Sequence, residues 1–374
     1  MSSLSSRMPK LVIVTTVPET LATILSGQPR WLNQQMEVHC ITSPGYELER
    51  IADAEHVMVH ALPMQRGISP LRDLIAIMRM WCLLLRLAPD IIHSYTPKAG
   101  LVAMLASFAA RVPVRVHTFT GLIFPTATGL KRWVLVRIDR LICAAATWVV
   151  PEGEGVKRDM IASRITKKPM KVIGSGNIAG VDTNYFAPEH SESLQIEGFV
   201  FCFVGRLNRD KGIGELVAAF LELPDSAQLL LVGQVDETAP VDSDVMAVIQ
   251  QHPRIHAVGF LSDIRPALVS ASVLVLPSYR EGFPNVVLQG GAMALPVIAS
   301  DINGCNEVIE PGFNGWLVPT KDTGALAQAM AEAMALTREE LSKMGLNARR
   351  RISERFERDH YLDRLMNFYR EVLT

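Results

Sequence analysis

The chain consists of short apolar runs that alternate with segments of helical periodicity. The runs in the first half are rich in β-branched residues, and after a polar stretch at residues 188–198 the same rhythm starts again. Such runs predict buried strands, and the segments between them predict amphipathic helices. The predicted strands are residues 10–16, 37–42, 91–94, 114–118, 148–150 and 171–173 in the first half, and 199–204, 228–232, 255–258, 273–277, 296–299 and 315–318 in the second.

Strands that alternate with helices are joined by right-handed crossovers and form parallel sheets. The pattern therefore predicts an α/β protein of two Rossmann-like domains, at residues 1–187 and 199–355, with a linker at 188–198. Residues 356–374 carry apolar side chains at helical spacing and are expected to form a helix that returns to the first domain. Because open parallel sheets bind ligands at the carboxyl ends of their strands, the two sheets are expected to face a central cleft that holds the functional site.

The composition fits a folded chain of two domains without a membrane span. The 374 residues are 49% hydrophobic with a mean hydropathy of +0.20, which excludes a disordered chain. The longest apolar stretches, residues 80–87, 101–110 and 133–150, are too short to span a bilayer or contain charges. The apolar run 11–17 ends at Pro18, unlike a signal peptide, so we expect a cytoplasmic location.

The five cysteines are scattered and form no C-x-x-C pair, which argues against a zinc site or a disulfide framework. We expect no metal.

Charge is distributed unevenly over a chain whose formal net charge is only -1. Residues 1–190 contain 21 Lys and Arg against 14 Asp and Glu, and the remainder contains 16 against 24. A basic half indicates an anionic partner. The charge alone leaves three classes of partner open: a nucleic acid, a phosphorylated substrate or an anionic membrane. Independent drift of the surface charge of two domains is the alternative.

The clearest local motif is the segment Gly205-Arg206-Leu207-Asn208-Arg209-Asp210-Lys211-Gly212, which follows the predicted strand 199–204. A turn with Arg206 and Lys211 that opens a helix is suited to a diphosphate, because arginine offers a planar donor fork and lysine a compact charge. The segment is neither a Walker A loop nor a G-x-G-x-x-G fingerprint. Two solvated charges on a surface turn are the alternative interpretation.

A second motif follows the predicted strand 273–277 and contains Glu281, Gly282 and Phe283. The backbone N–H groups of Gly282 and Phe283 are expected to face a ligand oxygen at the start of a helix. Gln289 lies eight positions after Glu281, about two helical turns, so both side chains are expected to reach one elongated ligand. A buried glutamate that bonds the amides of its own loop is the alternative.

The first domain offers weaker signals. His117 ends the predicted strand 114–118, and a lone histidine there is as often structural as functional. Thr96 and Pro97 are expected to begin a helix whose N-terminus, beside Lys98, forms a second anion site. Gly27 lies between the first strand and a possible short helix at residues 29–36. An ordinary helix start is an equally good interpretation of these last two segments.

Together these motifs, with Gly180-Val181-Asp182 and Ala299-Ser300-Asp301, resemble the retaining nucleotide-sugar glycosyltransferases of family four, which have the two-domain GT-B fold. The resemblance covers essentially the whole chain. It implies that the second domain binds the donor and the first domain the acceptor. Gln289 departs from the family, whose Glu-x7-Glu motif ends in a glutamate that binds the ribose hydroxyls, and a glutamine amide bonds hydroxyls without the strength of a charge.

The resemblance also implies a role for each candidate residue. Arg206 and Lys211 are expected to neutralise the donor diphosphate, Glu281 to bond the donor sugar, and His117 to contact that sugar near its anomeric carbon; these four form the expected catalytic set. The expected acceptor site contains Tyr95 and Lys98. The expected donor site contains Gly27, Gly205, Arg206, Lys211, Glu281, Gly282, Phe283 and Gln289.

The segments around Tyr95 and His117 are similar to the bacterial branch that extends undecaprenyl-diphosphate-linked sugars. This similarity implies transfer of a hexose or N-acetylhexosamine from a UDP-sugar, a co-substrate rather than a cofactor, to a lipid-diphosphate-linked saccharide. The basic first domain, with Trp81, Trp133 and nearby arginines, is then expected to lie on the anionic inner face of the cell membrane, and no nucleic acid is expected. A UDP-sugar 2-epimerase of related fold and a non-catalytic sugar-nucleotide or membrane-binding protein are the alternatives.

Overall fold

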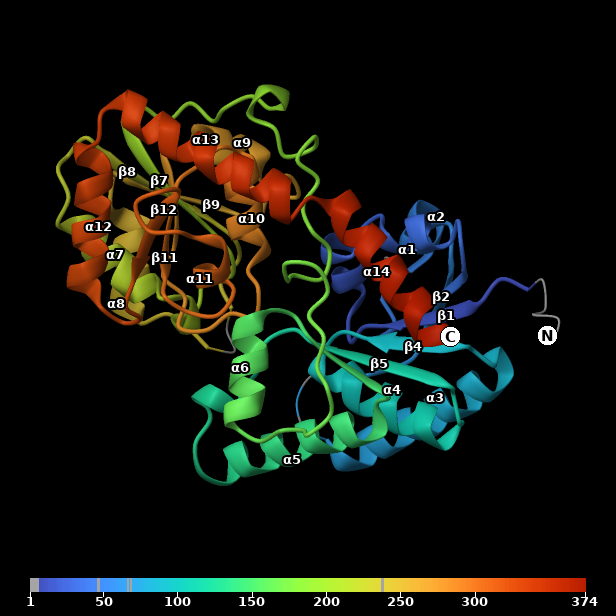
Figure 1. Ribbon diagram of the computed structural model, residues 1–374. Helices are drawn as coiled ribbons and strands as arrows, with labels where there is room; N and C mark the ends of the chain where they lie inside the picture. Colours follow the sequence, from blue (N-terminus) through green and yellow to red (C-terminus); the bar gives the residue numbers. More distant parts are fainter. Residues whose placement is uncertain (1–6, 46–47, 66, 68, 237–238) are drawn as a thin grey trace. The chain divides into compact units, whose positions relative to one another are not determined.

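The computed structural model describes residues 7–45, 48–65, 67, 69–236 and 239–374 (Figure 1). Contacts within the chain divide it into two compact units. Unit 1 contains the chain up to Ala179 and also Tyr361–Thr374, whereas unit 2 is the continuous segment Gly180–His360. Each unit is built on one six-stranded parallel sheet. The predicted α/β class with two Rossmann-like domains is confirmed.

The sheet of unit 1 has the strand order β3-β2-β1-β4-β5-β6. Its inner strands are apolar on both faces because helices cover both sides, which is why they read as continuous apolar runs rather than as alternating patterns. The strands are β1 (Lys10–Val14), β2 (Glu37–Thr42), β3 (Met58–Ala61), β4 (Ile91–Ser94), β5 (Val114–Phe119) and β6 (Trp148–Pro151).

Alternate residues of these strands enter two separate cores. Val12 and Ile92 pack with four helices on one face, and Leu11 and Val116 pack with the helices on the other. The first group of helices is α3 (Pro70–Leu87), α4 (Pro97–Ala109), α5 (Gly129–Ala145) and α6 (Glu154–Ala162). The second group is α1 (Gln28–Leu32), α2 (Leu48–Glu55) and the C-terminal α14 (Arg358–Leu373), and Figure 1 shows α14 beside this sheet.

The sheet of unit 2 has the strand order β12-β11-β10-β7-β8-β9. Phe201 and Phe203 of β7 pack with α7, while Val200 and Cys202 face α9. The strands are β7 (Phe199–Val204), β8 (Ala227–Val232), β9 (Ile255–Gly259), β10 (Val273–Leu276), β11 (Val297–Ser300) and β12 (Gly315–Val318). The helices are α7 (Ile213–Leu221), α8 (Ser243–Gln251), α9 (Arg265–Ser270), α10 (Asn285–Ala292), α11 (Cys305–Val308), α12 (Thr323–Ala335) and α13 (Arg338–Arg355).

The structure differs from the sequence-based expectation at two strands of unit 1. The edge strand β3 was not predicted, because its four residues are partly exposed and form no apolar run. The strand predicted at 171–173 is absent from the described structure; Met170 makes only an isolated bridge to Val149, and Pro169 before it and Gly174 after it prevent extension.

The junction between the units also differs from expectation. Residues 188–198, expected to be the linker from their polar composition, lie in unit 2, where the Leu194 N–H donates to the Ser270 Oγ at 2.7 Å. The boundary falls before Gly180, because Val181 pairs with Glu357 and the Arg349 guanidinium donates to the carbonyl of Thr183. The helix expected at 356–374 is present as α14, which belongs to unit 1 and is separated from α13 by residues 356–357.

Among the described residues, no helix is long and apolar enough to cross a membrane.

Candidate active site

Three loops of unit 2 begin at the carboxyl ends of neighbouring strands. Residues 205–212 follow β7, residues 277–284 follow β10, and residues 301–304 follow β11. Because β7, β10 and β11 are adjacent in a parallel sheet, the three loops meet at one edge of it. The two strongest sequence motifs are thus brought together.

The first loop is held by its own side chains. The Asn208 Oδ1 accepts a hydrogen bond from the Lys211 backbone N–H at 3.0 Å and caps a short 3-10 helix, Arg209–Lys211. Gly212 follows with φ +70°, and a Cβ there would overlap the carbonyl oxygen of Pro277. Only glycine permits this backbone approach, so the first loop is fixed against the second at the start of α7.

Lys211 and Glu281 form a direct ion pair between these two loops. The Lys211 Nζ lies 2.5 Å from the Glu281 Oε1, and their side chains are 22% and 14% exposed. Burial, and then the charge of Glu281, raise the pKa of the Cys305 thiol well above its ordinary value, which places this thiol beside the pair. An ammonium has three donors, and one contact to a carboxylate leaves capacity for an anionic ligand.

Arg206 has a different partner. Its guanidinium pairs with Asp236 in the loop after β8, and the Asn208 Nδ2 donates to the same carboxylate at 3.1 Å. The Arg206 side chain is 61% exposed, whereas that of Asp236 is nearly buried. A solvated guanidinium with one fixed end remains able to bind a second anion. Arg206 therefore lies on the same loop as Lys211, but its described ion pair is with Asp236 and not with Glu281.

The remaining donor-site candidates of unit 2 lie around this pair. Gly205 begins the first loop, and its N–H donates to the Val232 carbonyl at 2.9 Å. Phe283 has a buried ring packed on Phe356 with 5.5 Å between ring centres, so its side chain belongs to the core and only its backbone is suited to a ligand, as at Gly282. Gln289 is half-buried in the second turn of α10, while Glu281 precedes that helix.

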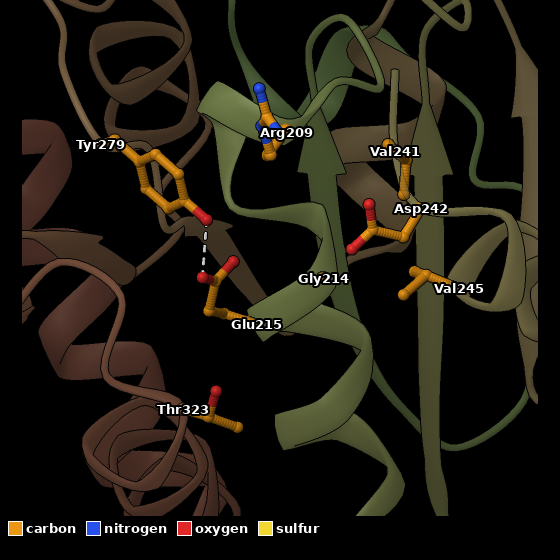
Figure 2. A pocket seen from close by; sticks show the side chains of 8 residues that line it. All are labelled: Arg209, Gly214, Glu215, Val241, Asp242, Val245, Tyr279 and Thr323. Carbon is orange, nitrogen blue, oxygen red and sulfur yellow. Dashed lines mark hydrogen bonds between the residues drawn. The ribbon is translucent and has the colours of Figure 1, made fainter. Parts of the chain in front are cut away.

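A separate pocket of about 300 Å³ lies on unit 2 (Figure 2). Arg209, Glu215 and Tyr279 line it, and the Tyr279 hydroxyl donates to the Glu215 Oε1 at 2.6 Å. Its lining contains none of Arg206, Lys211 and Glu281. The candidate site is therefore the loop edge itself and not this pocket.

In unit 1, His117 is an internal residue. Its side chain is 1% exposed, its Nδ1 lies 2.8 Å from the Ser94 Oγ, and its ring meets Phe119 edge-on at 4.5 Å between centres. Burial lowers the pKa of His117 to about 3, so the ring is neutral at physiological pH. These contacts lie within unit 1, and the expected contact of His117 with the donor sugar stays a prediction.

Tyr95 and Lys98, the expected acceptor residues, also have internal partners. The Tyr95 ring is fully buried against His93, and its hydroxyl accepts from the Gln28 Nε2 at 3.1 Å. The Lys98 Nζ contacts both oxygens of Asp73 on α3, at 2.6 and 2.7 Å. Tyr95 therefore lies in the core. Asp73 neutralises the charge of Lys98, which was expected to attract a phosphate.

The backbone N–H of Gly27 also has a partner within unit 1. Its N–H donates to the Glu55 Oε1 at 2.7 Å, and the Arg30 N–H donates to the other oxygen at 3.1 Å. A carboxylate therefore already satisfies the start of α1, where a donor phosphate was expected.

Two residues of the site were missed in the sequence. Asn208 stands three positions before Lys211, a spacing that is typical of a helix cap and was a usable signal. Asp236 lies 30 positions after Arg206, in a separate loop, and no local pattern marks it as the partner. Among the described residues, no cluster of three His, Cys, Asp or Glu side chains is arranged to hold a metal ion.

Two family models match the chain. The model described as glycosyl transferases group 1 matches residues 198–335, and the model described as glycosyl transferase 4-like domain matches residues 22–176. The first range contains Arg206, Lys211, Glu281 and Gln289, and the second contains His117.

Similar proteins align over nearly the full length. The chain is 28% identical over 376 residues to the capsular polysaccharide biosynthesis glycosyltransferase CapM of Staphylococcus aureus, with 97% of each chain covered. It is 26% identical over 357 residues, 91% of each chain, to the Escherichia coli UDP-Gal:alpha-D-GlcNAc-diphosphoundecaprenol alpha-1,3-galactosyltransferase. Among solved structures, HepE of Anabaena in complex with UDP superposes with a TM-score of 0.80 at 19% identity, covering 97% of this chain and 100% of that one. This likeness shows the GT-B fold.

Proposed function

Because the chain belongs to the family-four glycosyltransferases, we propose that it transfers a hexose or N-acetylhexosamine from a UDP-sugar to a polyprenyl-diphosphate-linked saccharide, with retention at the anomeric carbon. The observation that carries the proposal is the Lys211–Glu281 pair at the carboxyl edge of the unit 2 sheet, with Arg206 on the same loop. The names of the E. coli relative and of the HepE complex support UDP as the nucleotide and a lipid diphosphate as the acceptor.

In the proposed reaction, the bond between the anomeric carbon and the donor phosphate breaks while the acceptor hydroxyl bonds to that carbon. The acceptor proton passes to the departing phosphate oxygen, so no enzyme nucleophile takes part. The proposal also assigns no role to a metal ion. Negative charge grows on the diphosphate as it leaves, and cations already fixed at this place stabilise it without reorganisation. Lys211 and Arg206 supply that charge.

Glu281 has two tasks in the proposal. Its Oε1 holds the Lys211 ammonium in place, and its second carboxylate oxygen remains for a hydroxyl of the donor sugar. Gln289 is assigned to the ribose, where its amide bonds hydroxyls more weakly than a carboxylate would. The donor is therefore expected to depend on its diphosphate for much of its affinity.

The acceptor assignment to unit 1 rests on the relatives and not on Lys98 or Tyr95. Lys98 is paired with Asp73 and Tyr95 is buried. Because the proposed acceptor carries a lipid tail, unit 1 is proposed to lie at the membrane surface.

The test compares one lysine variant with one arginine variant of the same short 3-10 helix, Arg209–Lys211. Lys211→Ala is expected to lower kcat/KM for transfer by roughly 100-fold or more, because it removes a preformed charge from the leaving group. Arg209→Ala removes an equal charge two residues away, on the side of the separate pocket, and is expected to change kcat/KM by less than about threefold.

The first measurement is a thermal shift with UDP, UDP-sugars and GDP-sugars in a chelator, followed by an assay of UDP release with and without a lipid-diphosphate saccharide. Stabilisation by a UDP-sugar that Lys211→Ala weakens and Arg209→Ala preserves supports the donor site. UDP release that is independent of acceptor, or equal loss in both variants, contradicts the proposal.

A further inference from the structure

The pocket of about 300 Å³ on unit 2 takes no part in the proposed transfer (Figure 2). Its lining comes from segments that are far apart in the sequence: the short 3-10 helix Arg209–Lys211, helix α7, the start of α8, the loop after β10 and the start of α12. Small-molecule sites begin at about this volume, so the pocket has room for a ligand much smaller than a nucleotide sugar.

Polar side chains of the lining have bonding capacity left for a ligand. Asp242 precedes α8 without capping it, and within the part of the chain that the structure describes neither its carboxylate nor the Arg209 guanidinium has a partner. Glu215 accepts the Tyr279 hydroxyl with Oε1 at 2.6 Å, which leaves its second oxygen for another donor. The pocket therefore offers guanidinium donors together with carboxylate acceptors.

The charges at this pocket balance one another. Arg209 shares the lining with two carboxylates, Glu215 and Asp242, and the Lys321 ammonium lies 4.7 Å from the centre of the Tyr279 ring. The two carboxylates oppose an anionic ligand, and the two cations oppose a cationic one. A neutral ligand rich in hydroxyls suits both kinds of group, because a hydroxyl donates to a carboxylate and accepts from a guanidinium.

The lining also has an apolar part, which Val241 and Val245 supply. A sugar ring carries hydroxyls around its rim and C–H groups on its faces, so it can use apolar and polar lining groups at once. Small-molecule sites combine the two in this way, with the polar groups fixing the orientation of the ligand.

Gly214 keeps part of this space open. It lies in α7 without a positive φ, so its backbone does not require glycine. A Cβ at this position would have no other atom within 4 Å. The missing side chain therefore enlarges the pocket and does not relieve a close contact.

We infer that this pocket binds a neutral saccharide unit, at a site separate from the donor edge. The sugar hydroxyls bond to Arg209, Asp242 and the second oxygen of Glu215. The lining contains neither Lys211 nor Glu281, so the saccharide bound here is not the one that reacts. The inference goes beyond the proposed transfer and does not depend on it.

Saturation-transfer NMR on the intact protein tests the inference, with the methyl glycosides of glucose, galactose and N-acetylglucosamine as probes. Excess UDP is present to occupy the proposed donor site, and no acceptor is needed. Magnetisation is expected to pass from the protein to at least one glycoside, and neither inorganic phosphate nor putrescine is expected to displace it. If UDP itself does not bind, the proposed transfer fails, but the variants below still decide whether the glycoside occupies the pocket.

Gly214→Leu fills the pocket from α7 and is expected to weaken glycoside binding by roughly tenfold or more, because its side chain takes the space of the ligand. Ala218→Leu is the matched control. Ala218 is exposed about one turn further along the same helix and does not line the pocket, so this variant is expected to bind as the unchanged protein does.

Asp242→Asn tests the polar contact, since it keeps the shape of the side chain and removes its charge. It is expected to weaken binding by about fivefold, because a hydrogen bond to a charged acceptor is stronger than one to a neutral acceptor. Asp244→Asn, at an exposed position of the first turn of α8 outside the lining, is its control. Melting temperatures verify that all four variants are folded.

Four outcomes overturn the inference. They are absence of transfer to any of the glycosides, unchanged binding in Gly214→Leu, equal loss in a variant and its control, and displacement of the glycoside by phosphate or putrescine. The last outcome would identify the pocket as a site for a charged ligand.

Discussion

Lys98 and Lys211 each form an ion pair with a carboxylate, but the two lysines differ in their remaining capacity to bind an anionic ligand. Asp73 contacts Lys98 with both carboxylate oxygens, and the two side chains are 11% and 12% exposed between helices. Glu281 contacts Lys211 with one oxygen at a loop edge. A lysine held between two packed helices mainly positions them, whereas a lysine on a loop beside a second cation retains the capacity to bind an anion.

His117 makes the stability of unit 1 sensitive to acid. Its pKa is about 3 in the folded chain, lower than the ordinary value of about 6.5, so below pH 6.5 the unfolded chain binds a proton that the folded chain does not. Stability is therefore lost as the pH falls from 6.5 towards 3. Between pH 6.5 and 5 this residue is expected to remove roughly 1 to 2 kcal/mol.

The measurement is urea unfolding at pH 6.5 and 5, followed by tryptophan fluorescence, since Trp31, Trp81, Trp133 and Trp148 all lie in unit 1. Burial also lowers the pKa of His93, so some loss is expected to remain in His117→Gln. An unchanged difference between the two pH values in His117→Gln would contradict the assignment.

At the scale of elements, the C-terminal helix α14 completes a core built from the start of the chain. Leu365 and Tyr369 of α14 are fully buried with Leu11 and Ile13 of β1. The Tyr369 hydroxyl lies 2.7 Å from the His93 Nδ1, and that ring's Nε2 lies 2.7 Å from the Thr118 Oγ1. The helix therefore contributes both apolar burial and a buried hydrogen-bond chain to unit 1.

Truncation of one α14 side chain measures this contribution. Leu365→Ala is expected to lower the free energy of unfolding of unit 1 by about 2 to 5 kcal/mol, because it leaves a cavity in the core. Leu373→Ala, at the partly exposed end of the same helix, is expected to cost less than about 0.5 kcal/mol. Equal effects of the two variants on the tryptophan-monitored urea midpoint would show that α14 is only loosely attached.

Elements and site residues differ in how far they could be predicted. Strands buried on both faces, such as β7 and β10, are continuous apolar runs, and their loops carry Lys211 and Glu281 at positions that parallel-sheet geometry makes neighbours. The unit 1 candidates lacked this support. Asp73 and Glu55 are 25 and 28 positions away from Lys98 and Gly27, and no local pattern reveals that such distant carboxylates occupy the expected anion sites.

For the whole molecule, the important feature is that the chain passes between the units twice at neighbouring points. The Val181 N–H donates to the Phe356 carbonyl at 2.9 Å, and the Arg358 N–H donates to the Val181 carbonyl at 3.0 Å. Gly180 lies beside this pair with φ +64°, and a Cβ there would stand 2.7 Å from the Arg358 Cα. Both passages are thus fixed to one another at the border of unit 2.

Gly180→Ala is expected to destabilise unit 2 by roughly 2 kcal/mol or more, through backbone strain and through overlap with a neighbouring backbone that has little room to shift. Gly312→Ala is the matched control, because Gly312 also has a positive φ, +77°, but has open space around its Cβ position. Calorimetric unfolding of the two variants compares them. If Gly180→Ala lowers the free energy of unfolding no more than the control does, the two backbone segments joined at Val181 can shift with little loss of stability.

The same connectivity sets an order of events during synthesis. Unit 2 is one continuous segment that ends at His360, whereas unit 1 lacks α14 until all of unit 2 has been made. During synthesis the second domain is therefore able to fold first, while the domain that was begun first keeps an apolar sheet face uncovered until α14 has been made. Premature termination near residue 360 would leave a folded unit 2 joined to a unit 1 that lacks α14 and exposes an apolar sheet face, which favours aggregation.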